Sequence, residues 1–429
     1  MGKGRSRRKQ ATSSGFQDDE SALADPSDLK LAKRMEGVRL KDVELKMDHL
    51  LDESLEALFE KRASTREKAY SSIIQAFTRS FQYQFAQDNF DTLLQKCLSS
   101  IKRGSSKEIS LASRAMGLIS LTIGSGTYAQ EILGESILIF SDALKSPSHS
   151  PNPSALVECL AIITFVGGKE PADAMASMKI MWQLVDTKRS SNVVETKPSA
   201  ELIATTVSAC SFLFTTMDEW GFKYWLESVS CFSAMLEKDD RSIRIAAGEA
   251  LAVILETGNF GESLTDSPIH EVKNSLQGNA HIQSLWDKIL NKVRDLSKEA
   301  ANNKGSNKKN LKIQRNLFRD LLDFLEHGFC PETSMLIVDV PLNTTTWSEM
   351  IQLNYLKHFI GEGFLKHMQD NEFLHEIFDI VPKGRMLSAK DRGEFRKEKE
   401  SNVGLPSGKW RSNDTEEADW SDDEESAHW

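Results

Sequence analysis

At 429 residues the chain is long enough for two or three domains and a large hydrophobic core. It is 40% hydrophobic and 27% charged, and no run is long and apolar enough to span a bilayer. The five cysteines form no CxxC motif and show no pairing rhythm, which favours a reducing compartment over a disulfide framework. The net charge is −10, but residues 400–429 carry nine acidic and two basic side chains, so the remainder sums to only −3. Overall acidity therefore does not exclude an anionic partner.

Residues 1–37 are polar, serine-rich and poor in aromatic side chains, which predicts a disordered tail. Four basic residues near its start resemble a nuclear-import or nucleic-acid patch: Arg5, Arg7, Arg8 and Lys9. A solvated basic tail explains them equally well. Gly2 and Ser6 fit the N-myristoylation pattern, but this short pattern often matches by chance, so an unmodified terminus is the better interpretation.

Residues 38–302 have a helical pattern almost throughout, and residues 239–258 are its clearest unit. Small and aliphatic side chains recur there at helical spacing, on a face formed by Ala246, Ala247, Ala250, Leu251 and Ile254. Gly258 stands where a helix stop is expected. So many alanines on one face let neighbouring helices approach closely, which a stacked helical repeat requires.

The same pattern recurs upstream at a nearly constant period. Equivalent positions are Ala69, Ala112, Leu156, Ala204 and Ala247, in steps of 43, 44, 48 and 43 residues. This period matches HEAT or armadillo units of about 40–47 residues. We therefore predict an all-α, armadillo/HEAT-like α-solenoid of about five repeats. An irregular helical domain with coincidental spacing is the weaker alternative.

Each step leaves room for a second helix. We expect these second helices at 88–102, 128–145, 171–186 and 219–237, with a last long helix at 270–300. Asp88 is the expected cap of the first of them.

The chain changes character after this region. Residues 303–310 predict a basic linker, and residues 311–382 a smaller, mostly helical domain with a short hairpin within 335–347. Thr346 or Ser348 can cap the helix after the hairpin. Residues 383–429 predict a disordered interaction tail. It is first basic, with seven basic and three acidic residues in 383–399, and then acidic with Trp410, Trp420 and Trp429.

No motif for catalysis is present. The sequence lacks a Walker loop, HExxH, a zinc-type Cys/His spacing, a GxSxG elbow and the kinase motifs, so we expect no enzyme, no metal, no cofactor and no small-molecule substrate. The candidate chemistry is phosphate binding by a basic stripe that opens the helix after the linker: Lys308, Lys309, Lys312, Arg315 and Arg319. Such a row can neutralise phosphates along a backbone. A solvated face opposite a core face is the alternative interpretation.

Three long motifs follow one another in the chain: DDRSIRIAAGEALAVILETG (239–258), QRNLFRDLLDFLE (314–326) and QDNEFLHEIF (369–378). With them, residues 40–382 resemble the interferon-related developmental regulator family. The acidic, Trp-bearing C-terminus departs from the basic ending expected of animal members, and the linkers suggest a plant relative.

The resemblance implies a non-enzymatic regulator with an armadillo-type fold, present in nucleus and cytoplasm. It implies association with inactive ribosomes and repression of translation, with rRNA contact at the basic stripe. The alternative it implies is a transcriptional co-regulator that recruits histone-deacetylase corepressor complexes through the solenoid and the acidic tail.

Overall fold

The computed structural model describes residues 47, 49–145, 153–185, 198–217, 222–258, 280–299, 308–337 and 340–380. Residues 1–50 and 51–429 form two units by their contacts, and the elements below all belong to the second. The basic patch at Arg5 to Lys9, Gly2 and the tail from 383 onward lie outside the described residues.

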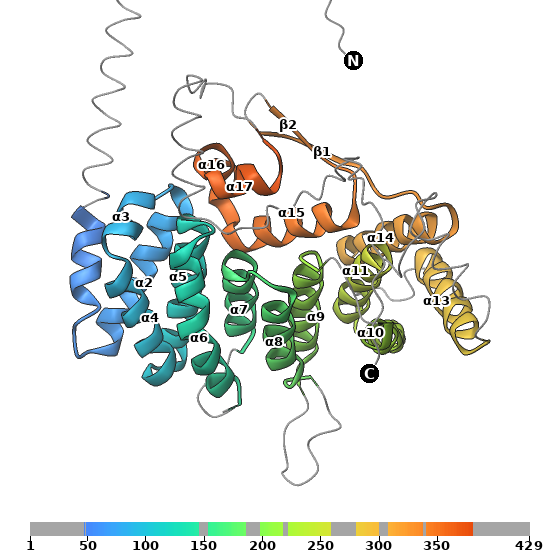
Figure 1. The fold of residues 1–429 in the computed structure, drawn as a ribbon, viewed down its shortest axis with the longest axis horizontal. Helices are drawn as coiled ribbons and strands as arrows, with labels where there is room; N and C mark the ends of the chain where they lie inside the picture. Colours follow the sequence, from blue (N-terminus) through green and yellow to red (C-terminus); the bar gives the residue numbers. More distant parts are fainter. Residues whose placement is uncertain are drawn as a thin grey trace, which may run out of the picture. The chain divides into compact units, whose positions relative to one another are not determined.

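Five helices stand side by side in chain order, and each packs against the next (Figure 1). They are α2 (Ala63–Arg79), α5 (Ser106–Ile123), α7 (Pro153–Gly167), α9 (Ala200–Phe214) and α11 (Arg241–Thr257). Of the five equivalent positions, Ala112, Leu156 and Ala247 are 0% exposed and Ala69 is 4% exposed, whereas Ala204 is only half-buried, so the register predicted for the fourth repeat is not matched at that residue. Because stacked repeats bury a core shared with their neighbours, the burial of the other four positions is what the repeat register requires. The prediction of an all-α solenoid is confirmed.

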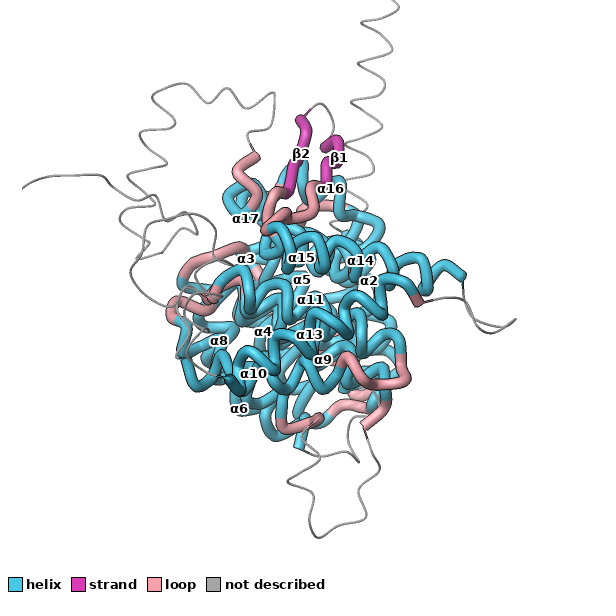
Figure 2. Tube along the Cα trace, turned by 90° about the vertical axis from the view of Figure 1, so that its right-hand side faces the viewer, coloured by secondary structure: helices cyan, strands magenta, loops and turns pink. Residues whose placement is uncertain are grey.

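The second helices form another layer. They are α4 (Phe90–Arg103), α6 (Thr127–Lys145), α8 (Pro171–Trp182), α10 (Phe222–Met235) and α13 (Ala280–Lys298), while the short helix α3 (Tyr83–Asp88) precedes α4 and contacts α5. Viewed from the side, helices fill this region and the two strands lie at one end of it (Figure 2). The expected cap at Asp88 is wrong: Asp88 ends α3, and Asn89 precedes α4 without a side-chain cap.

Polar caps fix where several first helices begin. The side chain of Ser105 accepts from the N–H of Glu108, and that of Ser199 accepts from the N–H of Leu202. Asp240 accepts from two backbone N–H groups at the start of α11. These side chains satisfy N–H groups that have no partner inside the helix. At the other end, α11 stops at Thr257, directly before Gly258 as predicted.

An arginine joins neighbouring elements at equivalent places in the first and last repeats. Arg66 precedes Ala69 by three residues, and Arg244 precedes Ala247 by three. The Nη1 of Arg66 donates to the carbonyls five and six residues before it, and the Nη1 of Arg244 does the same at 2.8 and 2.9 Å. This shared bonding supports the repeat register independently of the alanine spacing.

The C-terminal part begins with α14 (Lys308–His327), three residues inside the predicted linker 303–310. Then come β1 (Thr333–Ile337) and β2 (Val340–Thr344), which pair antiparallel with Met335 opposite Leu342. The expected hairpin is therefore present. The remaining elements are α15 (Trp347–Ile360), η1 (Gly361–Gly363), α16 (Phe364–Asp370) and α17 (Glu372–Ile377). Of the two candidate caps for α15, Thr346 is the one used.

Helices α15 to α17 lie across one end of the row of first helices (Figure 1). Side-chain hydrogen bonds join them in turn to the C-terminal ends of α11, α9, α5 and α2: Ser348 to Glu256, Gln352 to Thr215, Asn371 to Leu121, and His367 to Phe77. Gly363 passes so close to α2 that a Cβ there would lie 1.5 Å from the carbonyl oxygen of Thr78. The chain's own C-terminal segment thus covers this end of the repeats.

Candidate nucleic-acid interface

Helix α14 has two chemically different faces. Its buried face packs on α11 and α13 and consists of Leu311, Gln314, Leu317, Phe318, Leu321, Phe324 and Leu325. The spacing of three and four residues along this list places the apolar side chains on one side of an α-helix. The opposite side is left to solvent, and the predicted basic stripe falls there.

The described members of the basic stripe, Lys312, Arg315 and Arg319, are all exposed. None of the three forms an ion pair or side-chain hydrogen bond with another described residue. Lys308 and Lys309 lie in the first turn of α14, and their side chains are outside the description. We call Lys312, Arg315 and Arg319 the basic face. All three side chains are exposed to an external anion, and Arg319 also interacts electrostatically with the carboxyl group of Asp320.

The order of charges along α14 opposes the helix macrodipole. Residues 308–319 contain no acidic side chain, whereas Asp320, Asp323 and Glu326 lie in the second half. A helix favours anions at its N-terminus and cations at its C-terminus, by about 0.3–1 kcal/mol for each charge in the terminal turns. This arrangement therefore does not serve the stability of the helix itself. It concentrates positive charge in the N-terminal half.

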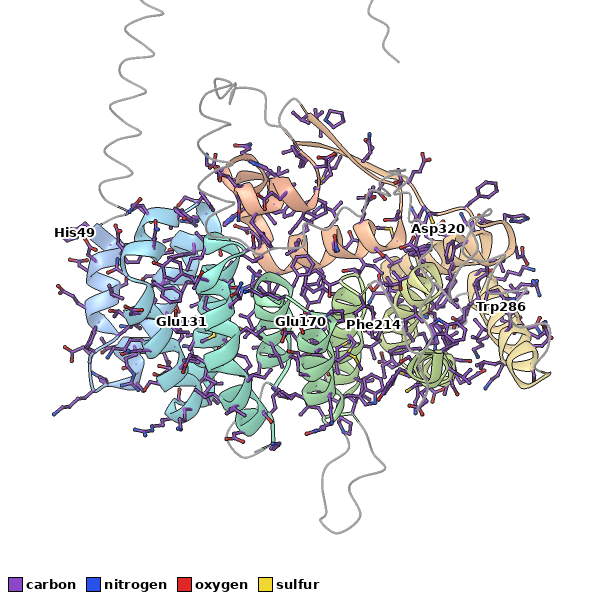
Figure 3. All side chains as sticks on the ribbon, in the orientation of Figure 1. His49, Glu131, Glu170, Phe214, Trp286 and Asp320 are labelled. Atoms are coloured by element: carbon purple, nitrogen blue, oxygen red, sulfur yellow. The ribbon has the colours of Figure 1, made fainter. Side chains whose placement is uncertain are left out.

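Asp320, labelled in Figure 3, directly follows Arg319, the last residue of the basic face. Partial burial raises the pKa of its carboxyl group, the neighbouring Arg319 lowers it, and Asp323 raises it again. Further along α14, Glu326 accepts a 2.7 Å hydrogen bond from Arg294 of α13. That acidic side chain is thus engaged by another helix.

A polar network anchors the N-terminal half of α14 beneath the basic face. Gln314 is 0% exposed, and its Oε1 accepts from Arg244 at 3.0 Å and from Arg241 at 3.2 Å. Its Nε2 donates to Glu299, which also pairs with Arg244 at 3.2 Å. The network links the start of α11, the end of α13 and the start of α14. The Nε of Arg244 is buried without a hydrogen-bond partner, but its Nη atoms and both polar atoms of the Gln314 amide are bonded, and buried hydrogen bonds of this kind favour one arrangement of their members.

Close packing adds to this anchor. A Cβ placed on Gly248 of α11 would lie 2.9 Å from the ring of Phe318, which is 0% exposed. The helices therefore meet directly at this glycine. The face of α11 singled out from the sequence is buried throughout: Ala246, Ala247, Ala250, Leu251 and Ile254 are at most 3% exposed. Helix α14 packs on α11, and the basic face lies on the side of α14 opposite to α11.

Two anchoring residues were missed by the sequence analysis, although each carries a signal. Gln314 is a polar residue at a core position of an amphipathic helix, between Leu311 and Leu317. Glu256 is an acidic residue in the last turn of α11, where the macrodipole disfavours it. Its carboxylate accepts from the N–H groups of Trp347 and Ser348 at 2.7 and 2.8 Å, at the start of α15. Each residue is unexpected at its place in its helix because it contacts another element: Gln314 contacts α11, and Glu256 contacts the start of α15.

Metal and membrane sites were searched for over the same described residues. There, no group of three or more His, Cys, Asp or Glu side chains is placed to hold a metal ion. No helix in that part of the chain is long and apolar enough to cross a membrane.

Comparison with known proteins identifies the family. A sequence model described as "Interferon-related developmental regulator (IFRD)" matches residues 19–326, which is more than half of the chain. The chain belongs to the IFRD family. Interferon-related developmental regulator 1 of Sus scrofa is 24% identical over 347 residues, covering 80% of this chain and 72% of the relative. Interferon-related developmental regulator 2 of Mus musculus is 24% identical over 340 residues, covering 76% and 72%.

IFRD membership confirms the predicted family and supports a regulatory role in general. The match of the family model ends at residue 326, near the end of α14. It therefore includes the basic face and the repeats. The suggested plant origin is not tested by these comparisons and stays a prediction.

Proposed function

We propose that this IFRD protein is a non-enzymatic regulator that binds ribosomal RNA through the basic face of α14 and represses translation on inactive ribosomes. The observation that carries the proposal is the set of exposed, unpaired cations at Lys312, Arg315 and Arg319 on a firmly anchored helix. A fixed row of cations is suited to a fixed row of phosphates.

The spacing of the basic face fits a phosphate backbone. With a rise of 1.5 Å per residue, Lys312 and Arg319 lie about 10 Å apart along the helix axis. Arginine can also bind phosphate through two parallel N–H groups. Each phosphate contact contributes about −0.7 to −0.9 to the slope of log affinity against log salt. Three contacts therefore predict a slope of about −2 to −3 from this face alone.

A transcriptional co-regulator is the alternative proposal. Here a corepressor complex would be recruited through the repeats and the acidic tail. The end of the repeat row that α15 to α17 cover is already occupied, so such a partner would use the layer of second helices or the tail. We propose presence in both nucleus and cytoplasm, which either role permits.

Sucrose-gradient sedimentation of extracts from growth-arrested cells tests the ribosome proposal. We expect the wild-type protein to co-migrate with 60S or 80S particles, and K312E/R315E/R319E to stay at the top of the gradient. The matched control reverses three exposed cations elsewhere that form no ion pair with another described residue, in K102E/K288E/K357E. Wild-type protein found only at the top would contradict the proposal.

A further inference from the structure

The acidic tail is complementary in charge to the basic face. Residues 414–429 carry eight acidic side chains and no lysine or arginine. The basic face carries three exposed cations that form no ion pair with another described residue. Opposite charges at these densities attract one another, most strongly at low ionic strength.

The chemistry of the two segments matches beyond net charge. Ile313, an apolar side chain on α14 beside Lys312, is 47% exposed. The tail places Trp420 between Asp419 and Asp422. An indole ring can pack on an exposed aliphatic side chain and on a guanidinium, while the flanking carboxylates pair with arginine. A mixed basic and apolar surface suits a segment of this kind.

The chain is long enough to bring the tail to α14. The last described helix, α17, lies at the ends of α5 and α7, where Phe373 contacts Gly124 and Phe165. From there to α14 the row takes three or four interhelical steps of about 8–10 Å, which sum to at most about 40 Å. Residues 381–413 lie between α17 and the tail, and a chain of that length spans about 110 Å when fully extended.

We propose that residues 414–429 bind back onto the basic face of α14 in the same chain and compete there with RNA. The competition rests on the proposed function, whereas the docking itself does not. The segment 383–399, with seven basic and three acidic residues, is the competing site within the chain, and the cross-linking experiment below distinguishes the two. The basic face has no acidic residue from 308 to 319.

The expected effect on RNA binding is modest. An intramolecular segment reaches effective concentrations of about 1 mM, and weak electrostatic docking has a dissociation constant of about 0.1–1 mM. The tail would then weaken RNA binding about two- to tenfold. Salt screens both interactions, so the difference shrinks as ionic strength rises.

Zero-length carbodiimide cross-linking of the full chain, read by mass spectrometry, tests the docking without RNA. We expect amide bonds between Lys312 and carboxylates of residues 414–429, and few from the exposed Lys288 and Lys357. R315E/R319E keeps the reactive amine and should lower the yield. Equal yields at all three lysines, cross-links confined to residues 383–399, or cross-links found only between two copies would overturn the proposal.

RNA binding tests the competition. Fluorescence anisotropy with a labelled 20-nucleotide poly(U) strand compares the full chain with D422N/D423N/E424Q/E425Q, which should bind two- to tenfold more tightly at low salt. The control neutralises four exposed glutamates elsewhere, in E131Q/E135Q/E227Q/E332Q, and should bind like wild type. Unchanged affinity in the tail variant overturns the competition. Cross-linking at Lys312 without any RNA binding would instead contradict the proposed function and leave the docking in place.

Discussion

Arg66 and Arg244 occupy equivalent places in the first and last repeats, but their side chains bond to different kinds of partner. Arg66 pairs with a single carboxylate, Glu108 of the next first helix, through two hydrogen bonds of 2.7 and 2.8 Å. Arg244 divides its bonds between Glu299 at the end of α13 and Gln314 in α14. An arginine at this position therefore joins one repeat to the next at the N-terminal end of the row. At the C-terminal end it joins α11 to the basic helix α14.

The difference shows that α14 takes the place of the next first helix in the row. It packs against α11 and α13, as α5 packs against α2 and α4. The arginine meets Glu108 in the first repeat and Gln314 in the last, and these two side chains are 1% and 0% exposed. A neutral amide replaces the carboxylate at the position that faces both Arg241 and Arg244. Helix α14 is thus packed and hydrogen-bonded to its neighbours at the same position as a repeat helix.

The largest effect is expected at the first of these two contacts. Arg66→Ala leaves the carboxylate of Glu108 buried without its cation, and removing one partner of a buried pair costs about 3 kcal/mol of unfolding free energy. Urea denaturation measures it. The control Lys107→Ala removes an exposed pair with Glu67 and should change the free energy by less than about 0.5 kcal/mol. Equal effects of both variants would show that the Arg66 pair is not buried in solution.

The same pair predicts a loss of stability in acid. Burial alone would raise the pKa of Glu108, but hydrogen bonds from Arg66 and Ser100 outweigh it and hold the pKa below its usual value. A lowered folded-state pKa contributes stability above the unfolded-state pKa of about 4.3, which is lost as the pH falls through the folded value. Glu108→Gln has no carboxyl group at this position, so its free energy of unfolding, measured by urea denaturation across a pH series, should fall less in acid than that of the wild type.

A smaller effect is expected at the second contact. Gln314→Leu keeps the volume but removes the amide that meets Arg241, Arg244 and Glu299, which should cost about 1–2 kcal/mol. Amide hydrogen exchange measured helix by helix tells the two contacts apart. Gln314→Leu should increase the exchange rate in α14 and leave the rate in α2 unchanged. Arg66→Ala should increase the exchange rate in α2 and leave the rate in α14 unchanged. Increased exchange in both helices from either variant would contradict the separation.

Much of the repeat fold could be predicted from sequence because one physical requirement recurs. Close helix crossings favour small residues, so Ala69, Ala112 and Ala247 stand at equivalent places of their repeats and are buried, although Leu156 takes that place in the third repeat. The hairpin and the helix stop at Gly258 follow from local chemistry in the same way. The error at Asp88 arose because α3 breaks before α4, which residue spacing alone does not show.

Contacts between distant elements could not be read from the sequence. Nothing local indicates that His367 meets the carbonyl of Phe77, or that Asn371 donates to Leu121. These pairs depend on the path of α15 to α17 across the repeats. For the candidate site, the sequence predicted which cations share a face of α14, since helical period decides that. It did not indicate what anchors the helix.

The smallest effect on stability and the largest on function are expected from the basic face itself. Reversing the exposed charges in K312E/R315E/R319E touches no packed contact, so each change should alter the unfolding free energy by less than about 0.5 kcal/mol. RNA affinity measured across a salt series tests the central claim most directly. We predict that the triple variant lowers affinity most at low salt and makes the log–log salt slope shallower by about 2–3. A slope and affinity equal to those of K102E/K288E/K357E would contradict it.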